Sequence, residues 1–304
     1  MTADYHRLLM IFVDGVGLAA ATVDNPLAEL PTPGIHRILG GPLTLEQCRQ
    51  TDTLLLSAID ATLGIEGLPQ SATGQAALFT GINAAKVMGR HVTGLPGPRI
   101  RGLVESQNLF QMAAENGFRS TFANAYNQAY LDALATGIRQ PSVTTCALLS
   151  AGLAFRDFKD LGRNQAVSWD IVRDRFSEQV GQELAPIEAA EAGRHLAAVA
   201  NRHCLTVYET FITDLAGHGR LGFTAEETVA RVDGLVDGVA QGLGPSTTVL
   251  MTSDHGNFEE SHHRRHTRNP VPLLVVGPLA RCFADIESIL EITPRILASL
   301  GAPG

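Results

Sequence analysis

The chain has 304 residues, of which 45% are hydrophobic and 18% charged, a composition typical of a globular enzyme and too apolar for a disordered protein. Its 23 basic and 31 acidic residues give a formal charge of −8 with no long basic run, so neither nucleic acid nor an anionic membrane is an expected partner. The length allows one large domain or a core that carries an insertion.

The N-terminal segment MTADYHRLLMIFVDGVG has a short apolar stretch that Asp14 interrupts, and it lacks a basic leader and a cleavage site. No later run approaches the roughly 20 apolar residues of a membrane span. These features predict a cytoplasmic protein. The four cysteines are scattered singly, which favours reduced and mostly buried thiols over a thiolate metal site or a redox pair.

The first predicted strand is RLLMIFVDG at residues 7–15, a continuous apolar run that stops at Asp14 and a glycine. Two later segments repeat this pattern: CLTVYETFITDLAGH ends with Asp214 and its neighbours, and STTVLMTSDHG ends with Asp254. Strands buried on both faces of a parallel sheet have this appearance. Because the carboxyl ends of such strands share one edge, we expect the three aspartates to converge there.

Helical patterns fall between these strands. Residues 105–115 carry apolar positions at helical spacing and stop before Asn116-Gly117, and residues 118–124 indicate another strand. Residues 186–202 and 224–244 predict two further helices, the second with Thr224 at its N-cap. The alternation predicts an α/β fold with a doubly wound, mainly parallel sheet and helices on both faces.

Histidines accompany the strand-end aspartates: His218 follows Asp214, His255 follows Asp254, and His266 lies in the next loop. Carboxylate and imidazole together suit zinc or manganese better than magnesium or calcium alone. Each residue alone could be a turn cap or a solvated loop residue. Three carboxylates at one sheet edge would repel one another without cations, however, so the pattern favours a metal site.

A candidate nucleophile is Ser71 in GLPQSATGQAALFTGINA. The apolar stretch from Ala76 to Phe79 predicts a helix that begins near Ser71, where free backbone N–H groups favour an anion such as phosphate. An ordinary capping serine is the alternative interpretation. A serine hydroxyl is a weak nucleophile until a base or a metal activates it, and the metal-ligand pattern supplies that activation.

These motifs resemble the alkaline phosphatase superfamily, and most closely its branch containing cofactor-independent phosphoglycerate mutase and phosphopentomutase. The resemblance is carried by VDGVG, DNPLAELPTPGIHRIL, GLPQSATG, TDLAGH, TSDHGNFEE and HTRNPVPLL. It implies two divalent metals, zinc or manganese first and magnesium as the alternative. The implied ligands are Asp214, His218 and His266 for one metal, and Asp14, Asp254, His255 and the Ser71 oxygen for the other.

The resemblance covers both ends of the chain and leaves its middle unmatched. We therefore expect a phosphatase-like core at residues 1–124 and 187–304, with a small cap inserted at about residues 125–186. After the nucleophile segment, Arg90, His91, Arg99 and Arg101 either clamp an anionic substrate or form a solvated basic loop. His262 and His263 have no place in the family pattern, and we interpret them as solvated.

The implied function is phosphoryl transfer through a phosphoserine at Ser71, on a small phosphorylated substrate. A phosphatase is the first prediction, and a phosphomutase or a phosphodiesterase with the same site is the alternative. A third interpretation comes from Gly15, Gly17 and Ala20, whose spacing matches a dinucleotide-binding turn. It is weakened by Asp14, whose charge would lie beside the pyrophosphate. The oligomeric state does not follow from the sequence.

Overall fold

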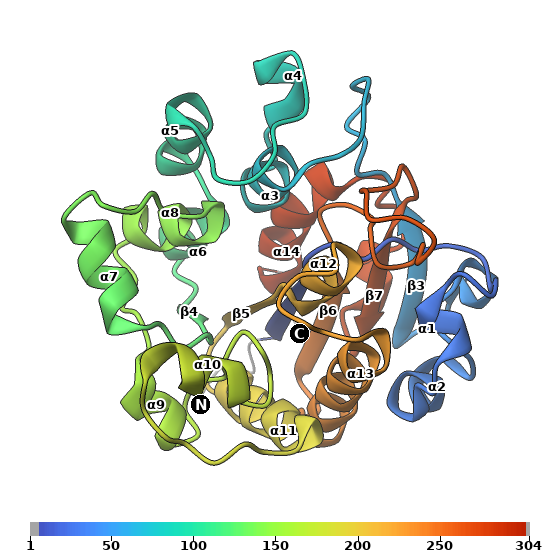
Figure 1. Ribbon diagram of the computed structural model, residues 1–304. Coiled ribbons are helices and arrows are strands. Elements are labelled where there is room, and N and C mark those ends of the chain that lie inside the picture. Colours follow the sequence, from blue (N-terminus) through green and yellow to red (C-terminus); the bar gives the residue numbers. More distant parts are fainter. Residues whose placement is uncertain (1–5, 302–304) are drawn as a thin grey trace.

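The computed structural model describes residues 6–301. A seven-stranded sheet in the order β2-β3-β7-β6-β1-β5-β4 forms its middle (Figure 1). The strands β6, β1, β5 and β4 run parallel, whereas β7, β3 and β2 join antiparallel to their neighbours. The strands are β1 (Arg7–Val13), β2 (Arg49–Gln50), β3 (Leu54–Ile59), β4 (Ser120–Phe122), β5 (Leu205–Thr210), β6 (Thr247–Thr252) and β7 (Val271–Val276).

Helices cover both faces of this sheet, as the sequence predicts. They are α1 (Pro26–Glu29), α2 (Pro33–Leu39), α3 (Ser71–Thr80), α4 (Ala84–Met88), α5 (Pro98–Ser106), α6 (Leu109–Glu115), α7 (Gln128–Ala135), α8 (Val143–Ser150), α9 (Phe158–Gly162), α10 (Asp174–Val180), α11 (Ala189–Ala200), α12 (Ile212–Gly217), α13 (Ala225–Gly242) and α14 (Ile292–Leu300). Three 3-10 helices are η1 (Leu45–Gln47), η2 (Ala280–Phe283) and η3 (Ile289–Glu291). The doubly wound α/β fold is confirmed, with a mixed sheet.

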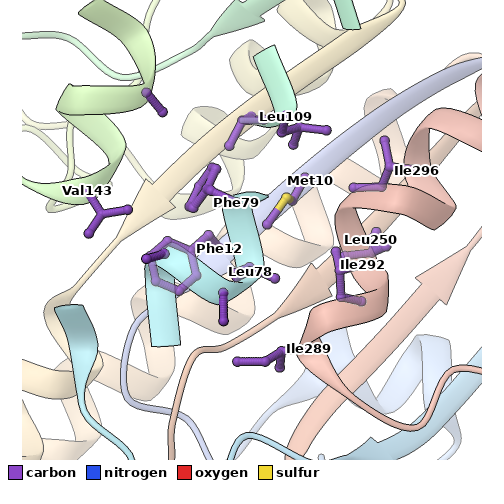
Figure 2. Close-up of a cluster of buried hydrophobic side chains, with 14 of the residues drawn as sticks. Met10, Phe12, Leu78, Phe79, Leu109, Val143, Leu250, Ile289, Ile292 and Ile296 are labelled. Atoms are coloured by element: carbon purple, nitrogen blue, oxygen red, sulfur yellow. The ribbon is translucent and has the colours of Figure 1, made fainter. Parts of the chain in front are cut away.

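Strand β1 shows why the sheet is buried on both sides. Met10 and Phe12 belong to the core that also contains residues of α3 and α14, and Figure 2 shows them in one cluster with Phe79 of α3 and Ile296 of α14. Ile11 and its alternate neighbours belong to the second core, which contains residues of α11 and α13. Because side chains alternate along a strand, one continuous apolar run supplies both cores.

Two sequence predictions need correction. The helix expected at residues 105–115 is divided into α5 and α6, because the Asn108 side chain accepts the N–H groups of Phe110 and Gln111 and so caps a new helix. Asp214 does not end strand β5; it lies in the first turn of α12, four residues beyond Thr210. The stop at Asn116-Gly117 is confirmed, with Gly117 in the left-handed region at φ 77°.

The proposed cap is not a separate layer throughout. Helix α8 contributes Val143, Cys146, Ala147 and Leu148 to the same core as α3, whereas Leu161 of α9 and Phe176 of α10 pack in a small cluster of their own. In Figure 1 the helices α7 to α10 lie together beside β4. The boundaries of the cap at residues 125 and 186 therefore stay a prediction.

The cysteines and the hydropathy of the helices bear on two further sequence predictions. All four cysteines are free, but only Cys146 is buried and Cys48 is exposed, so the expectation of mostly buried thiols is wrong. Cys48 lies just after η1 at the surface, outside the apolar runs that form the core. Over residues 6–301, none of the helices combines the length and the apolar character needed to cross a bilayer.

Candidate metal centre

The three aspartates meet at the edge of the sheet where the parallel strands end. Asp14 follows β1 and its N–H donates to the Thr210 carbonyl at the end of β5. Gly15 has φ 75°, and a side chain there would lie 2.8 Å from the Asp214 Cβ, so a glycine permits this close approach of the two loops. Asp254 follows β6 by two residues.

Asp14, Asp254 and His255 form the first cluster, which we call the buried group. His255 Nε2 lies 3.3 Å from Asp14 Oδ1 and 3.6 Å from Asp254 Oδ2, and the side chains of Asp254 and His255 have no exposed surface. The Ser71 Oγ is 3.0 Å from His255 Nε2. A Cβ on Gly74 would lie 2.7 Å from the Asp254 backbone oxygen, so this glycine lets α3 approach the loop.

Asp214, His218 and His266 form the second cluster, which we call the open group. His218 Nε2 is 3.3 Å and His266 Nε2 is 3.5 Å from Asp214 Oδ1, and the two imidazole nitrogens are 3.1 Å apart. The Asp214 and His218 side chains keep 16% and 19% of their surface exposed. His255 stacks on His266 with ring centroids 3.7 Å apart, and its ring nitrogen also lies near this group, so the two clusters are contiguous.

Backbone carbonyls fix the tautomers of the open group. His266 Nδ1 lies 2.8 Å from the Pro69 oxygen, and His218 Nδ1 lies 2.9 Å from the Arg264 oxygen. A carbonyl oxygen can only accept, so each Nδ1 carries the proton and each neutral ring presents a bare Nε2 lone pair. Two such lone pairs face each other and a carboxylate oxygen, an arrangement that a shared cation stabilises.

The charges of the two groups differ. Burial, followed by the charges of Asp254 and Asp214, raises the pKa of Asp14 well above its usual value. Burial also raises the pKa of Asp254 and lowers that of His255. Burial raises the pKa of Asp214, but His266, His255 and His218 in their protonated forms, together with the hydrogen bond from Asn257, outweigh it and lower that pKa to about 2. The buried group thus resists ionisation in the absence of a counter-charge.

The donor set fits divalent cations. In the described part of the chain, Asp14 Oδ1 and both carboxylate oxygens of Asp254 are buried and make no hydrogen bond. Buried oxygens of this kind are costly unless a proton or a cation satisfies them. Asp14, Asp254, His255 and the Ser71 oxygen could hold one cation, and Asp214, His218 and His266 a second.

The residues that hold these ligands in place were not predicted from the sequence. Glu259 is almost fully buried and accepts hydrogen bonds from the N–H groups of Gly17 and Asn257, both at 2.8 Å, and from the side chains of Thr267 and Asn269. It therefore joins the loop after β1 to both ends of the loop that carries His255 and His266. Its only signal in the sequence is its place in NFEE, directly after the metal-ligand motif.

Two other supporting side chains lie beside the aspartates. Asn257 Nδ2 donates to Asp214 Oδ1 at 2.9 Å, and Gln75 Nε2 donates to Asp14 Oδ2 at 3.1 Å. Glu209, within β5, is a largely buried carboxyl whose pKa burial raises to about 7, with a contribution from the Asp254 charge. An acidic residue inside an apolar strand is the signal that could have found Glu209.

The four residues predicted to contact substrate lie in and after the loop that follows α4. The Val92 N–H donates to Thr73 Oγ1 at 3.2 Å, which places this loop beside the first turn of α3. His91 Nε2 faces the Ile65 oxygen at 3.3 Å, while Arg90 and Arg99 are exposed and Arg101 is partly buried. Among the contacts found for residues 6–301, none joins these four side chains to the aspartates of the metal centre.

His262 and His263 lie apart from the two groups. Both face Glu260 Oε2, at 3.8 Å and 3.1 Å, and His262 is 54% exposed. The Arg265 N–H donates to His263 Nδ1, which leaves the Nε2 proton of the neutral ring directed at Glu260. This geometry is that of a surface hydrogen bond and agrees with the expectation of solvated residues.

Comparison with known proteins supports the class of protein that this fold and site define. Residues 171–303 match the model of the Metalloenzyme superfamily. The fold is similar to that of the alkaline phosphatase from the Antarctic bacterium TAB5, with a TM-score of 0.56, 13% identity, and coverage of 97% of this chain and 98% of the other. The PH0037 protein from Pyrococcus horikoshii is similar at a TM-score of 0.56 and 12% identity over 99% and 98% of the two chains. The resemblance to metalloenzymes of the alkaline phosphatase superfamily is confirmed.

Sequence similarity points to a more specific group of relatives. The chain is similar to the 2,3-bisphosphoglycerate-independent phosphoglycerate mutase of Chromobacterium violaceum, with 33% identity over 96 residues, which are 29% of this chain and 19% of that protein. The enzyme of the same description from Cellvibrio japonicus is 27% identical over 148 residues, 46% of this chain and 27% of that protein. The matched segments therefore span only about a fifth to a quarter of these relatives' length.

Proposed function

We propose that this protein is a metal-dependent phosphatase that hydrolyses a small phosphate ester through a phosphoserine at Ser71. The observation that carries the proposal is the position of the Ser71 hydroxyl at the start of α3, 3.0 Å from His255 Nε2. The same nitrogen lies 3.3 Å from Asp14 Oδ1 and 3.6 Å from Asp254 Oδ2, two oxygens that have no hydrogen-bond partner among the described residues. A nucleophile, a set of metal ligands and a helix N-terminus thus share one sheet edge. The similarity to alkaline phosphatases in fold is consistent with this chemistry.

Each residue has a distinct part in the proposed reaction. The Ser71 oxygen would attack the substrate phosphorus as the ester P–O bond breaks, and its proton would pass to water, since His255 Nε2, 3.0 Å away, is itself a proposed metal ligand. The free N–H groups at the start of α3 can donate hydrogen bonds to the phosphate oxygens. The aspartates and histidines would hold the cations, which when bound would activate the hydroxyl oxygen and neutralise the phosphate charge. Glu259 keeps the two ligand-bearing loops in register.

The direct test compares wild type, Ser71→Ala and Ser106→Ala in hydrolysis of an aryl phosphate, with zinc, manganese or magnesium supplied separately. Ser106 is an exposed serine at the end of α5 and serves as the matched control. We expect Ser71→Ala to lose at least about a thousandfold in kcat/KM, as loss of a nucleophile usually does, and the control to stay near wild type. Equal rates for wild type and Ser71→Ala would remove Ser71 from the mechanism.

A phosphomutase is the second candidate, favoured by the sequence similarity to phosphoglycerate mutases. In a mutase, the alcohol formed in the first step stays bound and recaptures the phosphoryl group from Ser71, whereas in a phosphatase water takes it. Incubation with 3-phosphoglycerate separates the two, since isomerisation without free phosphate supports the mutase and release of inorganic phosphate supports the phosphatase. A phosphodiesterase with the same site would instead cleave bis(aryl) phosphate faster than the monoester.

Arg90, His91, Arg99 and Arg101 stay proposed substrate residues. The hydrogen bond between Val92 and Thr73 supports this placement for the first two, because it brings their loop to the turn that begins with Ser71. Arginine and histidine there would bind the anionic part of the substrate. Arg90→Gln should raise KM for an anionic ester more than it lowers kcat; an unchanged KM would leave the loop as a solvated surface.

A further inference from the structure

A small polar cavity lies at the opposite end of the sheet from the metal centre. It has a volume of about 110 Å³ and is lined by Arg156, Gln165, Val199, Arg202 and His203. His203 of this lining lies just before β5. The carbonyl of Arg119, just before β4, accepts the N–H groups of Cys204 and Leu205, so the cavity lies where β4 and β5 begin. The length of β5, about 17 Å, separates it from the residues that follow the carboxyl end of that strand.

Arg156 is fixed at the wall of this cavity by the protein backbone. Its Nε donates to the Phe122 oxygen at 3.1 Å, its Nη1 to the Gln165 oxygen at 2.7 Å and its Nη2 to Thr121 Oγ1 at 3.0 Å. Each Nη carries two hydrogens, so one donor on each remains for another partner. The guanidinium is therefore oriented in advance and still able to bind an oxyanion.

Arg202 and His203 present further donors from the end of α11. The Nε of Arg202 donates a hydrogen bond to the Ala198 oxygen at 2.9 Å, and its two Nη groups have no protein hydrogen bond among the described residues. His203 Nδ1 faces the Val199 oxygen at 2.9 Å, which leaves Nε2 free. When His203 is protonated, Nε2 becomes a donor as well.

The ionisable side chains that line this cavity are all basic. Among residues 6–301, no acidic side chain lines it. Burial first, and then the charges of Arg156, Arg119 and Arg202, lower the pKa of His203. Asp160 is the carboxylate that acts on Arg156, but its Oδ2 already accepts the Asp157 N–H. Arg156 and His203 are partly buried and Arg202 is exposed. Like charges this close together are costly for the partly buried groups unless an anion lies between them.

From this geometry we infer that the cavity formed by Arg156, Arg202 and His203 is a binding site for a small tetrahedral oxyanion, either inorganic phosphate or the phosphate group of a small molecule. Several water molecules would fill the same volume, at about 30 Å³ each, so one phosphate group fits. The two arginines supply directed donors, and His203 completes the site when it takes up a proton. This site is independent of the reaction proposed for Ser71.

The test measures the rise in melting temperature with increasing phosphate for wild type, Arg202→Gln, the double variant Arg202→Gln/His203→Gln, and Arg194→Gln. Arg194 is an exposed arginine of α11, eight positions before Arg202, and is the matched control. Binding to the native state alone raises stability in a saturable way. We expect the double variant to bind phosphate about tenfold more weakly or worse, the loss of a charge-assisted hydrogen bond, and Arg194→Gln to match wild type. The metal centre is the same in all four proteins, so phosphate binding there shifts their melting temperatures equally and does not affect the comparison.

Two further arms identify the ligand. Methylphosphonate, which cannot be hydrolysed, represents a substituted phosphate. The binding to compare is the part that the double variant loses. If this part is stronger for methylphosphonate than for phosphate, the site binds a phosphate-bearing molecule; if it is weaker, the site binds free phosphate. Sulfate, whose charge is constant over the range of about pH 6 to 8 in which histidine titrates, should bind more tightly at the lower pH in wild type but not in His203→Gln. Identical phosphate responses in wild type and the double variant would overturn the proposal.

Discussion

The buried group and the open group of the metal centre use the same kinds of side chain in different settings. Asp14, Asp254 and His255 follow the ends of β1 and β6, and α3 approaches them through Ser71 and Gly74. Asp214 lies in the short helix α12, His218 is its C-cap residue, and His266 lies in a loop. Asp254 and His255 have no exposed side-chain surface, while Asp214 and His218 are in partial contact with solvent. The sheet thus fixes one ligand set and the loops fix the other.

This difference has an electrostatic counterpart. Neighbouring histidines lower the pKa of Asp214 to about 2, so the open group already contains an ionised carboxylate. The pKa values of Asp14 and Asp254 are raised chiefly by burial, so a cation must displace protons from the buried group. We expect the buried group to hold its metal with slow exchange and the open group to exchange its metal readily.

The largest effect should come from Asp254→Asn. This change removes a carboxylate whose two oxygens have no other partner among the described residues, so we expect loss of one metal per chain and a fall in kcat of at least about a thousandfold, comparable to removal of an essential catalytic group. Elemental analysis and turnover of an aryl phosphate check this. Two retained metals with near-normal turnover would break the contrast between the groups.

Glu259→Ala tests whether the two groups depend on a common support. The change leaves the N–H groups of Gly17 and Asn257 without their buried acceptor, so the free energy of unfolding should fall by roughly 2 to 4 kcal/mol. Urea denaturation measures it. Glu260→Ala, at the partly exposed neighbouring position, is the control and should change stability by less than about 1 kcal/mol. A similar loss in both variants would show that Glu259 has no special role.

His218→Ala should affect the open group alone. Because Asp214 and His266 remain, we expect activity to fall by about 10- to 100-fold and to recover partly when excess metal is added, as for other weakened metal sites. His263→Ala lies nearby and should leave activity unchanged, since its ring faces Glu260 rather than the metal ligands. If excess metal gave no recovery, the open group would not be the exchangeable one.

The smallest effect concerns Glu209 in the metal-free protein. Its pKa is about 7 in the folded chain and near its ordinary, lower value in the unfolded chain. Between these two pKa values the folded state binds more protons than the unfolded state. The free energy of unfolding therefore falls as pH rises from the lower value to the higher one. Glu209→Gln should remove this dependence and stabilise the metal-free protein above neutral pH by roughly 1 to 3 kcal/mol. Thermal unfolding at several pH values checks the sign; a steeper pH dependence in the variant would contradict it.

The sequence predicted those parts of the molecule that depend on local pattern. The apolar run 7–15 predicted a strand buried on both faces, and the aspartates near strand ends predicted the shared edge. Glu209 and Glu259 were missed because their roles depend on contacts between segments far apart in the chain, such as Glu259 with Gly17. The division of residues 105–115 was missed because the competing side-chain cap of Asn108 outweighs the apolar periodicity.

The antiparallel pairing of β6 with β7 allows the loop at residues 253–270 to accept insertions. Its two ends are held by adjacent strands and by Glu259, and the ligands His255 and His266 lie near those ends, while residues 261–265 between them include exposed positions. Lengthening a loop whose ends are already fixed adds little entropic cost. New side chains could therefore be inserted next to the reaction centre over evolutionary time, and substrate preference could diverge while the catalytic framework stays intact.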